Sequence, residues 1–139
     1  MTDISQLDQV AAQLEIRNAI GALARITDEG DFADYEALLT ADVEFDMMGR
    51  PVLGPAAVLE GMAQRRAAGS TGPGSNTRHC VTTVEVNLSS DSTAESHAAW
   101  LFFTDTLGAK TVAVLGTYSD RWVKTPTGWK LAERVVKPG

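Results

Sequence analysis

The segment TRHCVTTVEVN, residues 77–87, has the composition of a β-strand, because threonine and valine are enriched in strands. It contains His79, one of two histidines in the chain. Successive strand residues point to opposite faces of a sheet, so His79 is predicted to share a face with Val81 and Thr83, and Cys80 to point the other way. The strand-rich half of the chain begins with this segment, so the prediction of the fold starts from it.

Three further strands are predicted downstream, over about 93–106, 110–124 and 129–136. The short turns between them indicate antiparallel hairpins and hence a meander. In two segments, SHAAWLFF (96–103) and VAVLG (112–116), apolar residues occur on both predicted faces of the strand. A sheet with one solvated face would alternate apolar and polar residues. Self-association through the outer face, as a homodimer or homotrimer, is therefore predicted; an apolar surface on a monomer is the alternative.

The chain upstream of residue 77 is mainly helical in pattern. Apolar residues from Leu7 onward recur every three or four positions, which predicts a long first helix that ends near Gly30 in a left-handed conformation. A short second helix, a strand over 43–47, a turn at 49–51 and a third helix near Pro55 follow. Helices first and strands last indicate an α+β fold, with the helices on one face of an antiparallel sheet.

The composition is that of one globular domain spanning 1–139, with 44% hydrophobic and 22% charged residues. The net charge of −6 disfavours nucleic acid and anionic membranes as partners. Cys80 is the single cysteine, the N-terminal MTDISQLDQV lacks the features of a secretory signal, and no apolar run is long enough to span a membrane. A cytoplasmic location is expected. No spacing suggests a metal site or a cofactor.

Several segments together resemble a known family. They are ITDEGDF (26–32), LTADVEF (39–45), RHCVT (78–82), GTYSDRW (116–122) and GWKLAER (128–134). In this order and spacing they resemble the SnoaL-like family of the NTF2-like superfamily, and the resemblance covers nearly the whole chain. It implies a cone-shaped α+β fold, three N-terminal helices on a curved, mainly antiparallel sheet, with an internal apolar pocket.

Within that superfamily the chain looks most similar to the group containing scytalone dehydratase and hexachlorocyclohexane dehydrochlorinase. These are cofactor-free lyases that use a histidine–aspartate dyad, and the matching residues here are His79 and Asp28. A histidine titrates near neutral pH, so it can take a proton and return it within one turnover. A carboxylate that accepts from one ring nitrogen fixes the tautomer. The alternatives are a structural core histidine and an ordinary carboxylate at a helix end.

Six further residues are predicted to bind substrate: Arg134, Tyr118, His97, Leu101, Val114 and Leu23. His97 could act as an acid or hold a leaving oxygen, Tyr118 could donate to a substrate oxygen, and Arg134 could stabilise a developing anion. A structural role is the alternative for each, and for Arg134 it is an ion pair with Asp120 across the sheet. Leu23 stands where the dehydrochlorinase pattern has a lysine, which argues against halide elimination.

The predicted function is that of a cofactor-independent enzyme in which His79 and Asp28 act as a general base on a small apolar substrate. Dehydratase-like elimination, proton-transfer isomerisation and cyclisation are the candidate reactions. The alternative is a non-catalytic small-molecule-binding module, or an accessory subunit of an oxygenase-type complex, because a fold does not by itself define an activity.

Overall fold

The computed structural model describes residues 5–139, so the first four residues of the domain predicted over 1–139 lie outside it. The helices are α1 (Gln6–Glu29), α2 (Phe32–Glu36) and α3 (Pro55–Ala67). The strands are β1 (Leu39–Met47), β2 (Arg50–Leu53), β3 (Arg78–Leu88), β4 (Thr93–Thr104), β5 (Thr111–Thr125) and β6 (Gly128–Pro138). Within this part of the chain, no helix has both the length and the apolar character needed to cross a membrane.

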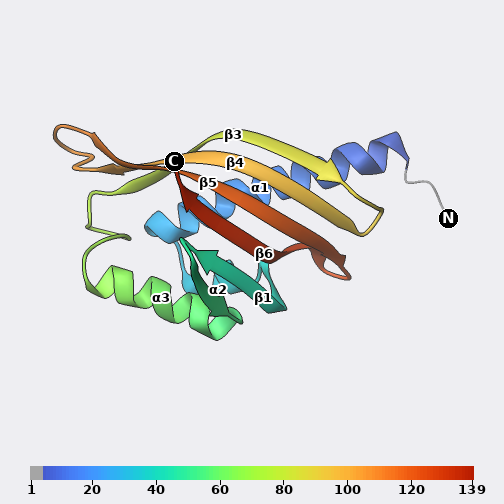
Figure 1. The fold of residues 1–139 in the computed structure, drawn as a ribbon, viewed down its shortest axis with the longest axis horizontal. Coiled ribbons are helices and arrows are strands. Elements are labelled where there is room, and N and C mark those ends of the chain that lie inside the picture. Colours follow the sequence, from blue (N-terminus) through green and yellow to red (C-terminus); the bar gives the residue numbers. More distant parts are fainter. Residues whose placement is uncertain (1–4) are drawn as a thin grey trace.

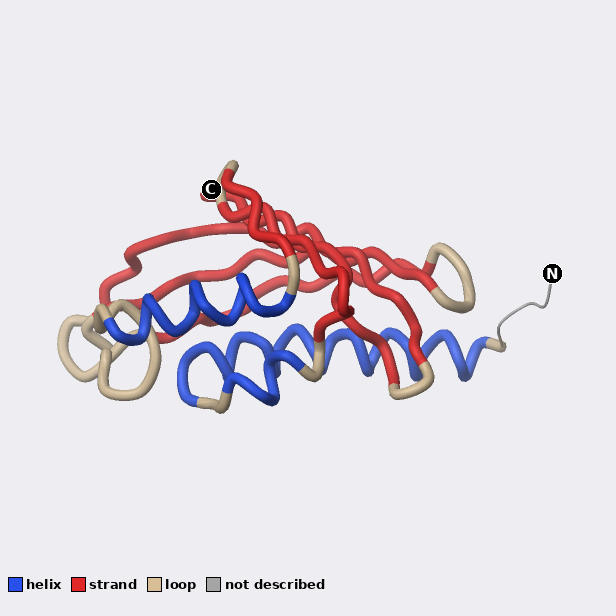
Figure 2. The backbone as a smooth tube through the Cα atoms, turned by 90° about the horizontal axis from the view of Figure 1, so that it is seen from below, coloured by secondary structure: helices blue, strands red, loops and turns tan. Residues whose placement is uncertain are grey.

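The six strands form one sheet in the order β2-β1-β6-β5-β4-β3. Neighbouring strands are antiparallel except for β1 and β6, which run parallel. Figures 1 and 2 show the helices gathered on one side of the curved sheet. The predicted α+β class is confirmed, and the predicted meander is the run from β3 to β6.

The core lies between α1 and the sheet. Ile16, Ile20 and Leu23 form one stripe of α1 and are at most 1% exposed. Facing the helices from β5 is Trp122, which is fully buried and whose Nε1–H donates to Ser96 Oγ over 2.8 Å. Burial of each large apolar side chain contributes about 1.5–3 kcal/mol to stability. This packing fixes the axis of α1 against the sheet.

The first turns of α1 lie outside the core. Leu7, Val10 and Leu14 are 78%, 51% and 55% exposed, although they continue the helical spacing. Figure 1 shows why, because the first turns of α1 extend beyond the end of β3. The apolar periodicity therefore predicted the helix correctly but overestimated the length of its buried stripe.

Two local predictions upstream of the meander are wrong. The expected turn at 49–51 is a tighter turn at Met48 and Gly49, followed by the short strand β2 that pairs with β1. Gly30 does end α1, but its φ of −103° is not left-handed. Glycine is needed there for space, because a Cβ at Gly30 would lie 2.9 Å from Ile26 Cα.

A β-bulge divides β3. The pairing with β4 skips Thr82, so one more residue of β3 than of β4 fits between the flanking pairs. A bulge of this kind reverses which side chains face the core. Val81 before it and Val84 after it both pack against the core. The prediction that Thr83 shares the face of His79 is therefore wrong, whereas Val81 does share it.

Candidate active site

A cavity of about 670 Å³ lies between the sheet and the helices, and all nine elements contribute to its wall. Most of the wall is apolar, with Phe45, Val58, Met62 and Phe102 as typical members. His79 is among its polar groups. The volume falls in the range of about 300–1,000 Å³ that is usual for small-molecule sites. The predicted internal pocket is present.

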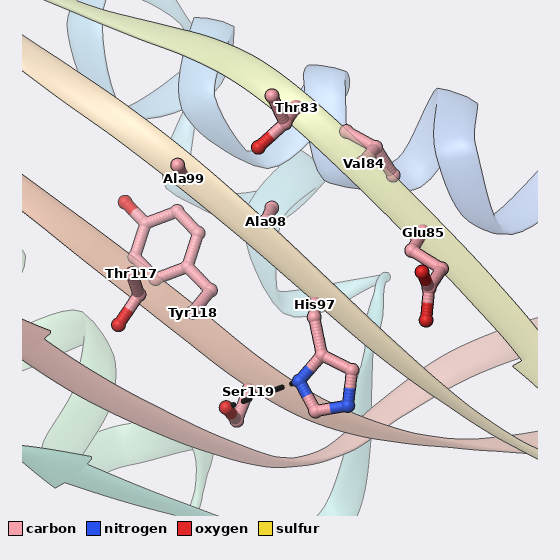
Figure 3. A pocket seen from close by; sticks show the side chains of 9 residues that line it. All are labelled: Thr83, Val84, Glu85, His97, Ala98, Ala99, Thr117, Tyr118 and Ser119. Carbon is pink, nitrogen blue, oxygen red and sulfur yellow. Dashed lines mark hydrogen bonds between the residues drawn. The ribbon is translucent and has the colours of Figure 1, made fainter.

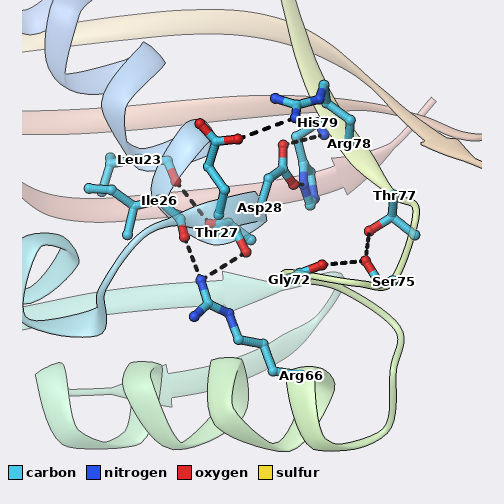
Figure 4. Close-up of polar contacts among 11 residues, drawn as sticks. Leu23, Ile26, Thr27, Asp28, Arg66, Gly72, Ser75, Thr77, Arg78 and His79 are labelled. Atoms are coloured by element: carbon cyan, nitrogen blue, oxygen red, sulfur yellow. Dashed lines mark hydrogen bonds and ion pairs between the residues drawn. The ribbon is translucent and has the colours of Figure 1, made fainter. Parts of the chain in front are cut away.

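His79 lies at the start of β3, and Asp28 holds its ring (Figure 4). Nδ1 is 2.8 Å from Asp28 Oδ1, and the backbone N–H of His79 donates to Asp28 Oδ2 over 2.9 Å. The Asp28 side chain is 1% exposed and that of His79 is 15% exposed. An ionised carboxylate can only accept, so Nδ1 carries the proton and Nε2 of the neutral ring keeps a free lone pair. The pair has the geometry of an oriented general base.

Arg66 of α3 fixes the end of α1 that carries Asp28 (Figure 4). Its Nη2 donates to the carbonyl oxygens of Ile26, Thr27 and Gly30 over 2.6, 3.2 and 2.8 Å. These carbonyls belong to the C-terminal end of the helix, where a cation is favourable. α1 has no basic residue in its own last turn. Arg66 therefore supplies that charge from another helix and limits the movement of Asp28.

Aromatic rings surround the imidazole of His79. Its ring centroid is 4.6 Å from that of Phe102 and 5.7 Å from that of Trp100. Trp100 also stacks on Tyr118 at 5.3 Å and lies so close to Gly116 that a Cβ there would come within 2.3 Å of the indole. These rings exclude water from one side of the proposed base, which strengthens its electrostatic interactions.

A second buried polar cluster lies deeper in the cavity wall. Arg134 donates to both carboxylate oxygens of Asp120, from Nε and Nη2, each over 2.8 Å. The two side chains are 5% and 1% exposed. The guanidinium carbon lies 3.9 Å from the ring centroid of Tyr118, in cation–π geometry. The alternative interpretation of Arg134, an ion pair with Asp120 across the sheet, is what the structure contains, and Arg134 also lines the cavity.

The charge states of this cluster follow from its burial. Burial raises the pKa of both Tyr35 and Tyr118 above the usual value for a phenol, and the positive charge of Arg134 opposes that rise only in part. Burial alone would lower the pKa of Arg134, but the carboxylate of Asp120 outweighs it and raises that pKa. The phenols therefore keep their protons and the guanidinium keeps its charge. Among residues 5–139, no group of three or more His, Cys, Asp or Glu side chains is arranged to hold a metal ion.

Four of the six predicted substrate-binding residues line the cavity, namely Leu23, Val114, Tyr118 and Arg134. Leu23 enters from α1, and the other three come from adjacent strands β5 and β6. The structure therefore brings these four residues and His79 to one cavity. Asp28 stands behind His79 and is not part of the cavity wall.

The predicted face of His97 and Leu101 is wrong. Both alternate along β4 with Trp100, which lines the cavity, so they point to the outer face of the sheet. His97 is exposed, and its Nδ1 lies 3.3 Å from Ser119 Oγ in an open hollow of about 530 Å³ (Figure 3). No sequence pattern distinguished the two faces, because this strand is apolar at both parities.

Among the cavity residues that were not predicted are two arginines. Arg50 begins β2, in a segment that was expected to be a turn, and Arg65 lies in the last turn of α3. Both line the cavity. One signal was available for Arg65, because it follows Met62 by three positions and so belongs to the same side of the helix. Nothing in the spacing pointed to Arg50.

The fold and the site define an α+β domain with a mostly apolar cavity between its helices and a curved sheet. The chain belongs to the SnoaL-like domain family, whose profile matches residues 8–135. The family predicted from the sequence segments is thus confirmed. No curated protein matches the chain in sequence.

Solved structures of NTF2-like proteins share this fold. One with a cystatin-like fold from Novosphingobium aromaticivorans has a TM-score of 0.83 at 21% identity, covering 96% of this chain and 85% of that chain. A proposed scytalone dehydratase from the same species gives 0.79 at 17% identity, covering 97% and 89%. A proposed dehydratase of the NTF2-like family from Streptomyces avermitilis gives 0.76 at 19% identity, covering 94% and 97%. At these identities the likeness shows the fold alone.

Proposed function

We propose that the protein is a cofactor-independent lyase or isomerase in which His79, oriented by Asp28, removes a proton from a carbon acid bound in the cavity. The observation that carries this proposal is the 2.8 Å contact between His79 Nδ1 and Asp28 Oδ1. It directs the lone pair of Nε2 away from the carboxylate, while His79 itself lies in the wall of a mostly apolar cavity. The backbone N–H of His79 also donates to Asp28 Oδ2, so two hydrogen bonds hold the carboxylate next to the ring.

The chemistry needs only proton transfer. Nε2 takes a proton from a carbon next to a carbonyl group, and the electrons of that C–H bond move towards the carbonyl as an enolate. In an elimination, they then form a C=C bond while a C–O bond breaks, and the imidazolium returns its proton to the leaving hydroxyl as water. In an isomerisation, the imidazolium returns the same proton to another carbon. Asp28 stabilises the imidazolium between the two transfers.

Tyr118 and Arg134 are the proposed stabilisers of the enolate. Both line the cavity, and the raised pKa of Tyr118 keeps its hydroxyl as a donor. Donors that are already in place where negative charge develops lower the barrier without reorganisation. His97 has no part in this step, because it points to the other face of the sheet. Membership of the SnoaL-like family and the proposed dehydratases among the similar structures support the reaction class.

Deuterium exchange tests the proposal even though the natural substrate is unidentified. The protein is incubated in D2O with cyclic β-hydroxy ketones and with β,γ-unsaturated ketones, and NMR follows the α-proton and the conjugated product. Enzyme-dependent exchange that disappears in His79→Gln is expected. Exchange that survives in that variant would contradict the assignment of the base. Conjugated product from the hydroxy ketones identifies a lyase, and from the unsaturated ketones an isomerase.

A non-catalytic binding module is the second candidate. The 670 Å³ cavity would serve such a module equally well. Saturable binding of these ketones with no exchange in the wild-type protein would favour this candidate. Self-association and a cytoplasmic location stay predictions.

A further inference from the structure

Three arginines line the cavity, and they differ in how their charges are balanced. Arg134 is paired with Asp120 through two hydrogen bonds. For Arg50 and Arg65, by contrast, the described chain offers neither an ion pair nor a side-chain hydrogen bond. Two positive charges of the cavity wall, on the exposed Arg50 and the half-buried Arg65, are therefore not paired with a carboxylate of residues 5–139.

Arg65 lines the cavity and is only partly exposed to solvent. It is half-buried in the last turn of α3, and its Nη1 lies 3.2 Å from the position that a Cβ on Gly61 would occupy. The absence of a side chain at Gly61 lets the guanidinium lie back along the helix. Tyr35 and Tyr118 line the same cavity.

The environment of Arg65 disfavours its positive charge. Burial lowers its pKa, and the positive charge of Arg50 acts in the same direction, whereas Tyr35 opposes the change. An arginine nevertheless remains protonated in proteins, so the charge persists and stays poorly compensated. Glu60 is the one carboxylate in the described cavity wall, and its Oε1 accepts from Gln64 of the next turn rather than from either arginine.

We propose that Arg65, together with Arg50, forms a binding subsite for an anionic oxygen group of the substrate, either a carboxylate or a phosphate. A guanidinium offers parallel N–H donors that match both groups, and a bound anion would supply the missing counter-charge. The substrate would then be amphipathic, with its acidic end at α3 and its apolar body against residues such as Phe45 and Met62. Only the description of this ligand as the substrate rests on the proposed function.

A matched set of probes tests the subsite by isothermal titration calorimetry. The probes are 2-naphthoate, 2-naphthyl phosphate and the neutral 2-naphthamide, which share one apolar body. The wild-type protein is expected to bind at least one anion about tenfold more tightly than the amide, as a charge-assisted hydrogen bond predicts. The better of the two anions identifies the carboxylate or the phosphate as the preferred group.

Variants then test whether Arg65 and Arg50 cause this preference for an anion over the amide. Arg65→Gln is expected to reduce it to about twofold or less, and the double variant Arg50→Gln/Arg65→Gln to abolish it. Arg17→Gln is the control, because it removes the same charge from an exposed position of α1. Wild-type protein that binds neither anion more tightly than the amide would overturn the subsite. An anion preference that persists in the double variant would overturn it equally.

His79→Gln separates this inference from the proposed function. The variant is expected to lose proton exchange and to retain the preference for the anion, because His79 lies on β3 and is not part of the subsite on α3 and β2. A wild-type protein that exchanges the proton but shows no preference for an anion would overturn only the inference. Absence of exchange in the wild type with an intact anion preference would overturn only the proposed activity.

Discussion

The two faces of one sheet carry the two histidines of the chain in contrasting surroundings. His79 on the inner face is held by a buried carboxylate and packed against two aromatic rings. His97 on the outer face is exposed and makes one contact of 3.3 Å, with a serine hydroxyl. The difference illustrates that the neighbours of a histidine fix its tautomer and limit its contact with water, and that the face of the strand on which it lies decides which neighbours it has.

Replacing each histidine with glutamine tests whether only the histidine on the inner face is needed for proton exchange. His79→Gln is expected to slow α-proton exchange about 10²–10⁴-fold, the usual contribution of a general base. His97→Gln is expected to change the rate less than about twofold, because the side chain does not reach the cavity. NMR in D2O measures both rates. Equal losses in the two variants would mean that the inner and outer faces are not functionally distinct.

Removing the charge of Asp28 tests whether the surroundings of His79 on the inner face matter for its reactivity. Asp28→Asn is expected to slow exchange about 10²-fold, because an amide can present a donor to Nδ1 and so favour the unproductive tautomer. Glu29→Gln, which neutralises the next and half-exposed carboxylate, is the control and is expected to keep the wild-type rate. An Asp28→Asn variant as active as the control would leave His79 without its proposed partner.

Arg66 should affect stability more than its neighbour does. Arg66→Met removes three hydrogen bonds to the end of α1, and is expected to lower the free energy of unfolding by about 2 kcal/mol. Arg65→Met is expected to lower it by less than about 0.5 kcal/mol, because Arg65 makes no such bond and the charge that is removed is half-buried and unpaired. Urea denaturation compares the two. A larger loss in Arg65→Met would contradict both assignments.

The outer face is tested through self-association. Leu115 of β5 is 51% exposed and is expected to be covered by another copy of the chain. Leu115→Glu should therefore reduce the mass found by sedimentation equilibrium to that of a monomer. Leu107→Glu, in the turn after β4 and 83% exposed, is the matched control and should keep the wild-type mass. A monomeric wild-type protein would show that the predicted self-association is wrong.

The smallest expected effect is spectroscopic. Tyr35 and Tyr118 are the only tyrosines, and burial raises the pKa of both. Tyrosinate absorbance should therefore appear only well above pH 10, whereas the urea-unfolded chain should titrate near the usual value of about 10. Above that value the unfolded state releases protons that the folded state retains, so stability should fall as pH rises. A folded protein that titrates like the unfolded chain would contradict the burial of the cluster.

Local patterns were enough to predict most of the fold. Apolar periodicity predicted α1 and the four strands of the meander within a few residues, and the turn residues separated them correctly. The parallel pairing of β1 with β6 was not predictable, because it joins segments far apart in the chain. The bulge at Thr82 was not predictable either, because threonine and valine occur on both sides of it.

The candidate site was predictable only in part. His79 and Asp28 are 51 positions apart, and their pairing came from family resemblance rather than from spacing. Arg66 reaches the end of α1 over 36 to 40 positions, and no local pattern encodes such a contact. The face of His97 was predicted wrongly because this strand has apolar residues on both faces. It therefore lacks the alternation of polar and apolar residues on which such a prediction depends.

The bulge in β3 also bears on how homologous chains should be compared. It separates the part of the strand that carries His79 from the part that carries the core residues Val84 and Val86, so each part can keep its own register. A lineage that lost the extra residue at Thr82 could retain the histidine only if the downstream side chains exchanged their polar and apolar identities. Alignments of relatives should accordingly place gaps at this position, and a one-residue offset there would mark divergence in packing rather than in chemistry.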